Sequence, residues 1–283
     1  MKDLHPFYSL SDLCRALQIS RSTYYAWLNR QPSARQRANE QLQSTLKSLF
    51  SEFKGSYGSP RLTHVLRSRG VPCSRKRVEK LMRQQGLVAR RRRRFRIRTT
   101  DSNHDYPICP NRLAAQAPPT RVDQVWVSDI TYIATREGWF YLAGVMDLYS
   151  RKIVGWAMQE SLQTSLPLHA LTMAIKHRRP LPSKSLLHHS DRGSQYASSE
   201  YQAQLQQAHI QSSMSRKANC YDNATIESFW STLKNELLAD VVFENREQAR
   251  QVLFQSIEIT YNRVRLHSSL GYKSPVDFEN QTN

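Results

Sequence analysis

The chain has 283 residues, of which 39% are hydrophobic and 10% aromatic, so a buried core is expected and a wholly disordered protein is excluded. At roughly 150 residues per domain, this length favours two domains. The net charge is +18, and residues 1–120 alone carry +17 of it. A strongly basic part joined to a near-neutral part indicates a polyanion-binding module attached to a second domain.

Membrane, secreted and zinc-finger proteins are poor interpretations of this sequence. The longest apolar run, 139–146, has eight residues, well short of the ~20 that span a bilayer, and no apolar signal core follows the first residues. The cysteines are far apart and form no C-x-x-C pair; they are Cys14, Cys73, Cys109 and Cys220. We therefore expect reduced thiols in a cytosolic protein.

The first 88 residues have the apolar spacing of short helices. Residues 11–17 and 21–28 predict two helices joined by a tight turn, with Ser20 as the cap of the second, which is the outline of a helix-turn-helix. Further helices are expected over 36–53, 61–70 and 75–85. The sequence predicts a small all-α helix-turn-helix DNA-binding region over 1–88.

The helix over 75–85 opens with Arg75, Lys76 and Arg77, although the first turn of a helix normally prefers acidic residues. Such an unfavourable dipole interaction is explained if these side chains face phosphates. The alternative is a basic turn that is merely solvated.

Residues 89–120 are predicted to be an arginine-rich linker that follows a nucleic-acid backbone. Seven arginines occupy nine positions and repel one another, which disfavours a compact free state. They are Arg90, Arg91, Arg92, Arg93, Arg94, Arg96 and Arg98. A localisation signal and an RNA-binding arm are the alternatives for such a run.

From residue 121 the pattern changes to that of an α/β domain, which we assign to 121–283. Strands are predicted over 125–133, 139–148, 152–158, 186–189 and 209–214. Helices are predicted over 166–177, 198–208, 223–238 and 246–261. Three successive strands followed by alternating helices and strands imply a mixed five-stranded sheet with helices on its faces.

Three acidic residues lie at positions that this predicted arrangement can bring to one site. Asp129 interrupts an apolar strand, Asp191 follows the end of a short strand, and Glu227 lies near the start of a long helix. Between the two aspartates are 61 residues, and between Asp191 and Glu227 are 35. Such a cluster can hold two divalent ions for phosphoryl transfer, whereas each acid alone is more often a cap or an ion-pair partner.

Several sequence blocks resemble those of DDE transposases, specifically the bacterial insertion-sequence transposases of the IS-three family and, more distantly, the retroviral integrases. The blocks are 126–132 (WVSDITY), 189–196 (HSDRGSQY), 223–229 (NATIESF), 261–275 (YNRVRLHSSLGYKSP) and 57–62 (YGSPRL). The resemblance covers about residues 57–278.

This resemblance implies an RNase H-like core in which Asp129, Asp191 and Glu227 are metal-binding catalytic acids. It implies Mg²⁺ as the ion, with Mn²⁺ able to substitute because all ligands are oxygen. Lys234, seven residues after Glu227, is expected to hold DNA beside the metals, and Gln195 and Tyr196 are further candidate DNA contacts. Water, and then a 3′-hydroxyl, would attack phosphodiesters in line.

The expected partners are double-stranded DNA, as terminal inverted repeats and as target, and further copies of the chain in at least a dimer on DNA. An upstream-frame helix-turn-helix and leucine-zipper product is a possible additional partner in this family, and the nucleoid of a bacterial cytoplasm is the expected location. Two rival functions remain at this point, a non-enzymatic helix-turn-helix regulator and a structure-specific Mg²⁺-dependent nuclease.

Three further side chains near the predicted site have competing explanations. Asp147 is expected to stabilise a turn and His188 to make a structural hydrogen bond. His189, two residues from Asp191, is either structural or in contact with DNA or the leaving group.

Overall fold

The computed structural model describes residues 7–90, 106–216, 223–238 and 241–282. The chain forms two compact units, Met1–Val88 and Ala89–Asn283. The predicted DNA-contacting residues Arg91, Arg92, Arg93, Arg94, Arg96 and Arg98 lie outside the described residues. Within the described ranges, no helix is both long enough and apolar enough to cross a membrane.

The first unit begins with a helix pair, α1 (Leu10–Ala16) and α2 (Arg21–Leu28). The Ser20 hydroxyl accepts a hydrogen bond from the Thr23 amide, which confirms the predicted cap of α2. Between them the two helices bury only Leu13, Cys14 and Tyr24, so this pair has a very small core.

Three longer helices complete the first unit: α3 (Ala34–Glu52), α4 (Ser59–Ser68) and α5 (Arg75–Gln84). Ser33 and Gln36 form a reciprocal capping box at the start of α3, and Ser74 caps α5. The leucine and valine positions predicted from helical spacing are buried between them. These include Leu42, Leu46, Leu49, Leu62, Leu66, Val78 and Leu81.

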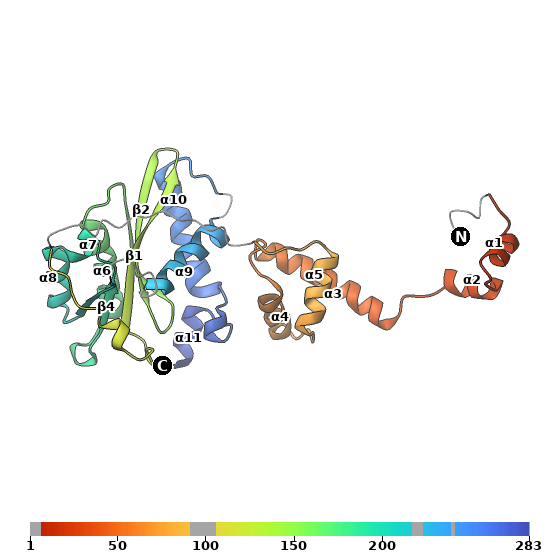
Figure 1. Ribbon diagram of the computed structural model, residues 1–283, viewed down its shortest axis with the longest axis horizontal. Helices are drawn as coiled ribbons and strands as arrows, with labels where there is room; N and C mark the ends of the chain where they lie inside the picture. Colours follow the sequence, from red (N-terminus) through yellow and green to blue (C-terminus); the bar gives the residue numbers. More distant parts are fainter. Residues whose placement is uncertain (1–6, 91–105, 217–222, 239–240, 283) are drawn as a thin grey trace. The chain divides into compact units, whose positions relative to one another are not determined.

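The second unit is built on the predicted mixed five-stranded sheet (Figure 1). Its strands are β1 (Val125–Thr135), β2 (Gly138–Asp147), β3 (Ile153–Gln159), β4 (Leu187–Ser190) and β5 (Gln211–Met214). They lie in the order β3-β2-β1-β4-β5. The β1–β2 and β2–β3 pairs are antiparallel, and the β1–β4 and β4–β5 pairs are parallel. The α/β expectation is thereby confirmed.

Helices cover both faces of this sheet because side chains on β1 alternate between two apolar clusters. Val125 and Val127 point to the face covered by α9 (Ala224–Thr232) and α10 (Arg246–Phe254). Trp126 points to the opposite face, which is covered by α6 (Ser165–Arg178), α7 (Ser194–Ala197) and α8 (Ser199–Gln207). Figure 1 shows the two helical layers on either side of β1.

Two of the predicted helices change their winding along their length. The helix expected over 223–238 consists of α9 followed by a π-helical stretch, Leu233–Leu237. Similarly, α10 continues into a π-helical stretch over Gln255–Val264. A final helix, α11 (Pro275–Thr282), was not expected from the sequence; its Glu279 forms ion pairs with Lys152 (2.9 Å) and with Arg178.

The sheet and α6 approach each other closely at Gly155 on β3. A Cβ at this position would lie 2.7 Å from the Ala174 amide nitrogen and against the Ala170 carbonyl oxygen. Because the obstacle is helix backbone, it cannot move away independently of the helix. The missing side chain at Gly155 therefore sets the spacing between β3 and α6.

We expect Gly155→Ala to lower the free energy of unfolding by about 1–3 kcal/mol, through overpacking. The matched variant is Gly144→Ala, whose Cβ would meet the edge of the Trp230 ring at 2.8 Å, a single side chain that can shift slightly without moving a helix backbone. Urea unfolding of both variants checks the order, with the larger loss at Gly155. Equal losses would contradict the role given to the α6 backbone.

Candidate active site

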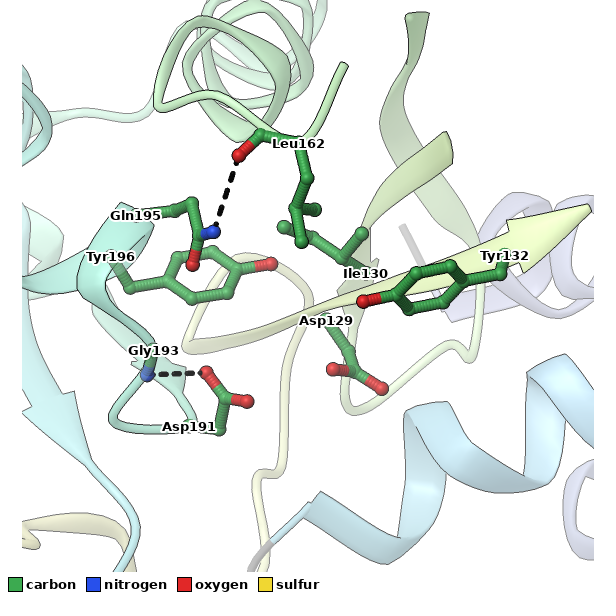
Figure 2. Close-up of a pocket in the computed structure, with 8 residues that line it drawn as sticks. All are labelled: Asp129, Ile130, Tyr132, Leu162, Asp191, Gly193, Gln195 and Tyr196. Atoms are coloured by element: carbon green, nitrogen blue, oxygen red, sulfur yellow. Dashed lines mark hydrogen bonds between the residues drawn. The ribbon is translucent and has the colours of Figure 1, made fainter. Parts of the chain in front are cut away.

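The candidate site lies where β1 and β4 stop pairing. Their parallel pairing ends at Val127↔His189, and Asp129 and Asp191 each stand two residues beyond that pair. Equal offsets on parallel neighbours place two side chains at the same level of a sheet. The two carboxylates consequently flank one small pocket, of about 280 Å³ including space open to solvent (Figure 2). It is lined by Asp129, Ile130, Tyr132, Leu162, Asp191, Gly193, Gln195 and Tyr196.

The orientation of the Asp129 carboxylate is fixed by a side chain from helix α9. The Trp230 indole N–H on α9 donates a 2.9 Å hydrogen bond to Asp129 Oδ2. Directly across from Asp129 on β2 is Gly144, where any Cβ would collide with the Trp230 ring. The absence of a side chain at Gly144 thus makes room for the indole that orients the carboxylate.

Asp191 is held by its own loop. The Gly193 amide donates a 2.9 Å hydrogen bond to Asp191 Oδ1, in the turn between β4 and α7. In Figure 2 the Asp191 and Asp129 carboxylates point into the same space. The two acids therefore reach one pocket from two strands, each fixed by a different donor.

The electrostatics of this pair is unfavourable in the protein alone. Burial, the charge of Asp191 and, more weakly, that of Glu227 raise the pKa of Asp129 to about 8. Burial also raises the pKa of Glu227. Asp129 therefore favours its neutral form, because its carboxyl group is removed from water and lies near two other acids.

Glu227 does not complete a closed cluster with the aspartates. It lies in the first turn of α9, exposed, and it is not among the residues that line the pocket. Across the described residues, no three His, Cys, Asp or Glu side chains stand close enough to hold a metal ion. The structure therefore brings Asp129 and Asp191 together and leaves Glu227 near enough for its charge to act on Asp129.

Lys234 is near the acids and is not a fully solvated lysine. It lies at the start of the π-helical stretch after α9 and is half-buried. Burial lowers the pKa of Lys234, and the charge of Asp129 opposes that shift. Its ammonium group is accordingly within the electrostatic reach of the pocket.

Gln195 and Tyr196 both line the pocket from α7. The Gln195 side-chain amide donates a 3.4 Å hydrogen bond to the Leu162 carbonyl, and the Tyr196 ring is buried (Figure 2). These side chains are therefore directed at the pocket rather than at the open protein surface.

The neighbouring histidines belong to the interior. His188 Nε2 lies 2.7 Å from Ser128 Oγ and 3.0 Å from the Tyr201 hydroxyl, and burial lowers the pKa of His188 to about 3. This neutral ring has the structural role that we expected. His189 Nδ1 lies 2.9 Å from Ser213 Oγ, and His189 is fully buried, which favours the structural explanation over a DNA contact.

Asp147 stabilises a turn, as expected. Its carboxylate accepts hydrogen bonds from the backbone amides of Asp123, Tyr149 and Ser150. Trp230 and Gly144, by contrast, are site residues that the sequence analysis missed. The available signal was that Trp230 follows Glu227 by three positions, which places both on neighbouring parts of one helix face.

In the first unit, the basic opening of α5 is divided between solvent and protein. Arg75 and Lys76 are exposed, whereas Arg77 is half-buried and its Nε donates a 2.9 Å hydrogen bond to Asn39 Oδ1 on α3. Arg90, at the end of the described segment, is exposed. Arg77 thus also joins α5 to α3.

Comparison with known families identifies both units. A family described as "Integrase core domain" matches residues 119–220, and a second family with the same description matches residues 208–275. The family "HTH-like domain" matches residues 36–95. The helix-turn-helix similarity therefore covers α3–α5, and the α1–α2 pair, for which the sequence pattern predicts a helix-turn-helix, lies outside the matched residues.

Curated relatives match almost the whole chain. An insertion element IS600 protein of 31 kDa from Shigella sonnei is 45% identical over 94% of this chain and 97% of its own length. The transposase InsF for insertion sequence IS3A from Escherichia coli K12 is 40% identical, over 97% of this chain and 95% of its own. The transposase for insertion sequence element IS904 from Lactococcus lactis is 44% identical, over 89% and 98%.

Among solved structures, the chain is similar to the catalytic core domain of HTLV-2 integrase, in a complex with magnesium. That similarity has a TM-score of 0.41 at 16% identity and covers 56% of this chain and 96% of the other.

The raised pKa of Asp129 makes stability depend on pH. Between about pH 4 and pH 8 the folded chain retains a proton on Asp129 that the unfolded chain has released, so stability falls as pH rises through this window. Without divalent cations, Asp129→Asn should therefore stabilise the protein by on the order of 3 kcal/mol at pH 8.5 and by little at pH 4.5. Thermal unfolding across this pH range measures the difference.

The matched control is Asp147→Asn, since Asp147 is also buried but its carboxylate accepts several hydrogen bonds. This variant should be destabilised at pH 8.5, because an amide nitrogen would face backbone donors. A gain for Asp129→Asn that is equal at both pH values would contradict the electrostatic explanation.

Proposed function

Because this chain belongs to the insertion-sequence transposases that have an integrase core domain, we propose that Asp129, Asp191 and Glu227 are the acids with which it cuts and joins DNA strands. The protein is a transposase, and the remaining question is which residues carry the chemistry. One observation supports the aspartates above all: they face one pocket from equal positions on two parallel strands.

The donor set suits a hard divalent cation. Burial and, after it, the negative charge of Asp191 raise the pKa of Asp129, and a cation between the two carboxylates would offset their repulsion. We propose that Asp129 and Asp191 hold Mg²⁺, that Glu227 contributes from α9, and that Mn²⁺ substitutes. When bound, the cation stabilises the charge that develops on the phosphate oxygens.

The chain's own residues hold the acids and position DNA. Trp230 and the Gly193 amide fix the orientations of Asp129 and Asp191. Lys234 is proposed to attract a phosphate beside the acids. Further proposed DNA contacts are Gln195 and Tyr196 at the pocket, and Arg75, Lys76, Arg77, Arg90, Arg91, Arg92, Arg93, Arg94, Arg96 and Arg98 in the basic part.

We further propose a division of labour along the chain, with DNA binding over 1–88, a basic linker over 89–120 and catalysis over 121–283. Two or more copies would act on double-stranded terminal repeats and target DNA at the nucleoid. An upstream-frame product with a leucine zipper would be an additional partner.

The carboxylate assignment is tested on the full chain with duplexes that carry candidate terminal inverted repeats. Asp129→Asn, Asp191→Asn and Glu227→Gln should each reduce Mg²⁺-dependent cleavage and strand joining by at least a thousandfold, because each removes a charged oxygen ligand. DNA affinity should remain within about threefold of wild type, since the basic surface is unchanged. Sequencing of joined strands and a binding titration measure the two effects.

The control is Glu200→Gln, an exposed acid on α8 that is not part of the pocket lining. It should join strands at the wild-type rate. Wild-type activity in any one of the three test variants would remove that residue from the proposed set. Cleavage without joining in the wild-type chain would indicate a nuclease, and binding without cleavage would indicate a regulator.

Lys234 provides a separate test of DNA positioning. Lys234→Ala should slow strand joining about tenfold or more, since a lost charge-assisted hydrogen bond weakens productive binding by ~1–2 kcal/mol. Lys234→Arg should keep much of the activity. Neither variant should have a lower melting temperature, because burial already disfavours the charged Lys234. Lys176→Ala, which removes an exposed lysine from α6, is the control. If Lys234→Ala and Lys176→Ala join strands equally well, Lys234 has no positioning role.

A further inference from the structure

Tyr196 is the most deeply buried polar side chain that reaches the pocket. Its exposed fraction is 1%, and its ring packs edge-on against Tyr201, with the ring centroids 5.3 Å apart. The backbone at this point is fixed by the short helix α7. Packing therefore fixes the position of the Tyr196 ring, and with it the position of the hydroxyl oxygen.

The Tyr196 hydroxyl has no hydrogen-bond partner among the described residues. A buried hydroxyl without a partner is unfavourable, by more than a typical hydrogen bond contributes, so such groups are rare in native proteins. Tyr201, the adjacent tyrosine, is equally buried but lies 3.0 Å from His188 Nε2. The contrast between the two neighbours indicates that Tyr196 is reserved for a group absent from the protein itself.

The surroundings of this hydroxyl define what that group is. Burial, Tyr201 and the charges of Asp129 and Asp191 raise the pKa of Tyr196 well above its ordinary value, so the hydroxyl keeps its proton and acts as a donor. Two other donors at the pocket, the Gly193 amide and the Gln195 side-chain amide, are bonded to Asp191 and to the Leu162 carbonyl. Tyr196 thus brings a proton-bearing oxygen to a pocket that two carboxylates also line, within reach of their charges.

We propose that the Tyr196 hydroxyl donates a hydrogen bond to an oxygen of the DNA phosphate that is cut or joined at this pocket. This inference rests on the proposed function, because the phosphate reaches the pocket only if Asp129 and Asp191 are the catalytic acids. The phenol remains protonated throughout and transfers no proton. Its hydrogen bond adds positive potential next to the phosphate, where the carboxylates are repulsive, and strengthens as negative charge accumulates on that oxygen.

Tyr196→Phe removes the hydroxyl and keeps the ring. In single-turnover strand joining at saturating DNA and Mg²⁺, we expect this variant to be about tenfold slower than wild type. The DNA dissociation constant, measured with Ca²⁺ in place of Mg²⁺, should change less than twofold. The matched control is Tyr201→Phe, which removes an equally buried hydroxyl outside the pocket and should join at the wild-type rate.

Thermal melting without DNA or metal gives an independent readout. Because the Tyr196 hydroxyl is buried without a partner, Tyr196→Phe should raise the melting temperature by about 2–4 °C. Tyr201→Phe should lower it by a similar amount, since His188 loses a hydrogen bond. Slower joining together with higher stability is a combination that a purely structural hydroxyl does not produce.

Two results overturn the proposal by itself. One is joining by Tyr196→Phe at the wild-type rate while the wild-type chain is active. The other is a lower melting temperature for Tyr196→Phe, which would reveal a structural hydrogen bond. If the wild-type chain joins no strands under any condition, the proposed function fails and this inference fails with it.

Discussion

Two aspartates side by side at the end of a partly buried strand pair repel each other, and the catalytic unit is arranged around that repulsion. Burial and neighbouring negative charge raise the pKa of Asp129 to about 8, so the arrangement lowers the stability of the protein alone. It persists because Trp230 and the Gly193 amide hold the two carboxylates in place. The large apolar cores on both faces of the sheet supply the stability that offsets this local cost.

Much of the fold could be predicted because its signals are local. Ser20 and Ser74 mark helix starts through their caps, and Asp129 is conspicuous because it interrupts an apolar strand. The π-helical stretches escaped detection, since the apolar residues there fit a helical period as well. Helix α11 is short, and what secures it is the contact of Glu279 with Lys152 and Arg178, residues far away in the sequence. Such contacts leave no local pattern.

The site was predicted less completely than the fold, and Glu227 illustrates why. Sequence spacing suggested three converging acids, yet α9 takes its position from the burial of Ile226, Phe229 and Trp230, which leaves Glu227 exposed in its first turn. Trp230 was missed because a tryptophan in a helix is most simply explained by the core, and here it serves both the core and, through its indole N–H, the carboxylate of Asp129.

The register of the short β1–β4 pairing determines both the stability of the fold and the alignment of Asp129 with Asp191. A slip of one residue would turn Asp191 to the opposite face of the sheet. The same slip would break the bond of His188 to Ser128 and leave polar atoms stranded in the interior, which is energetically severe. Misregistered chains therefore lose stability together with the alignment of the two carboxylates, and cellular proteases that degrade loosely folded proteins would remove them. His188 in this way ties the stability of the fold to the one register that brings the two carboxylates together.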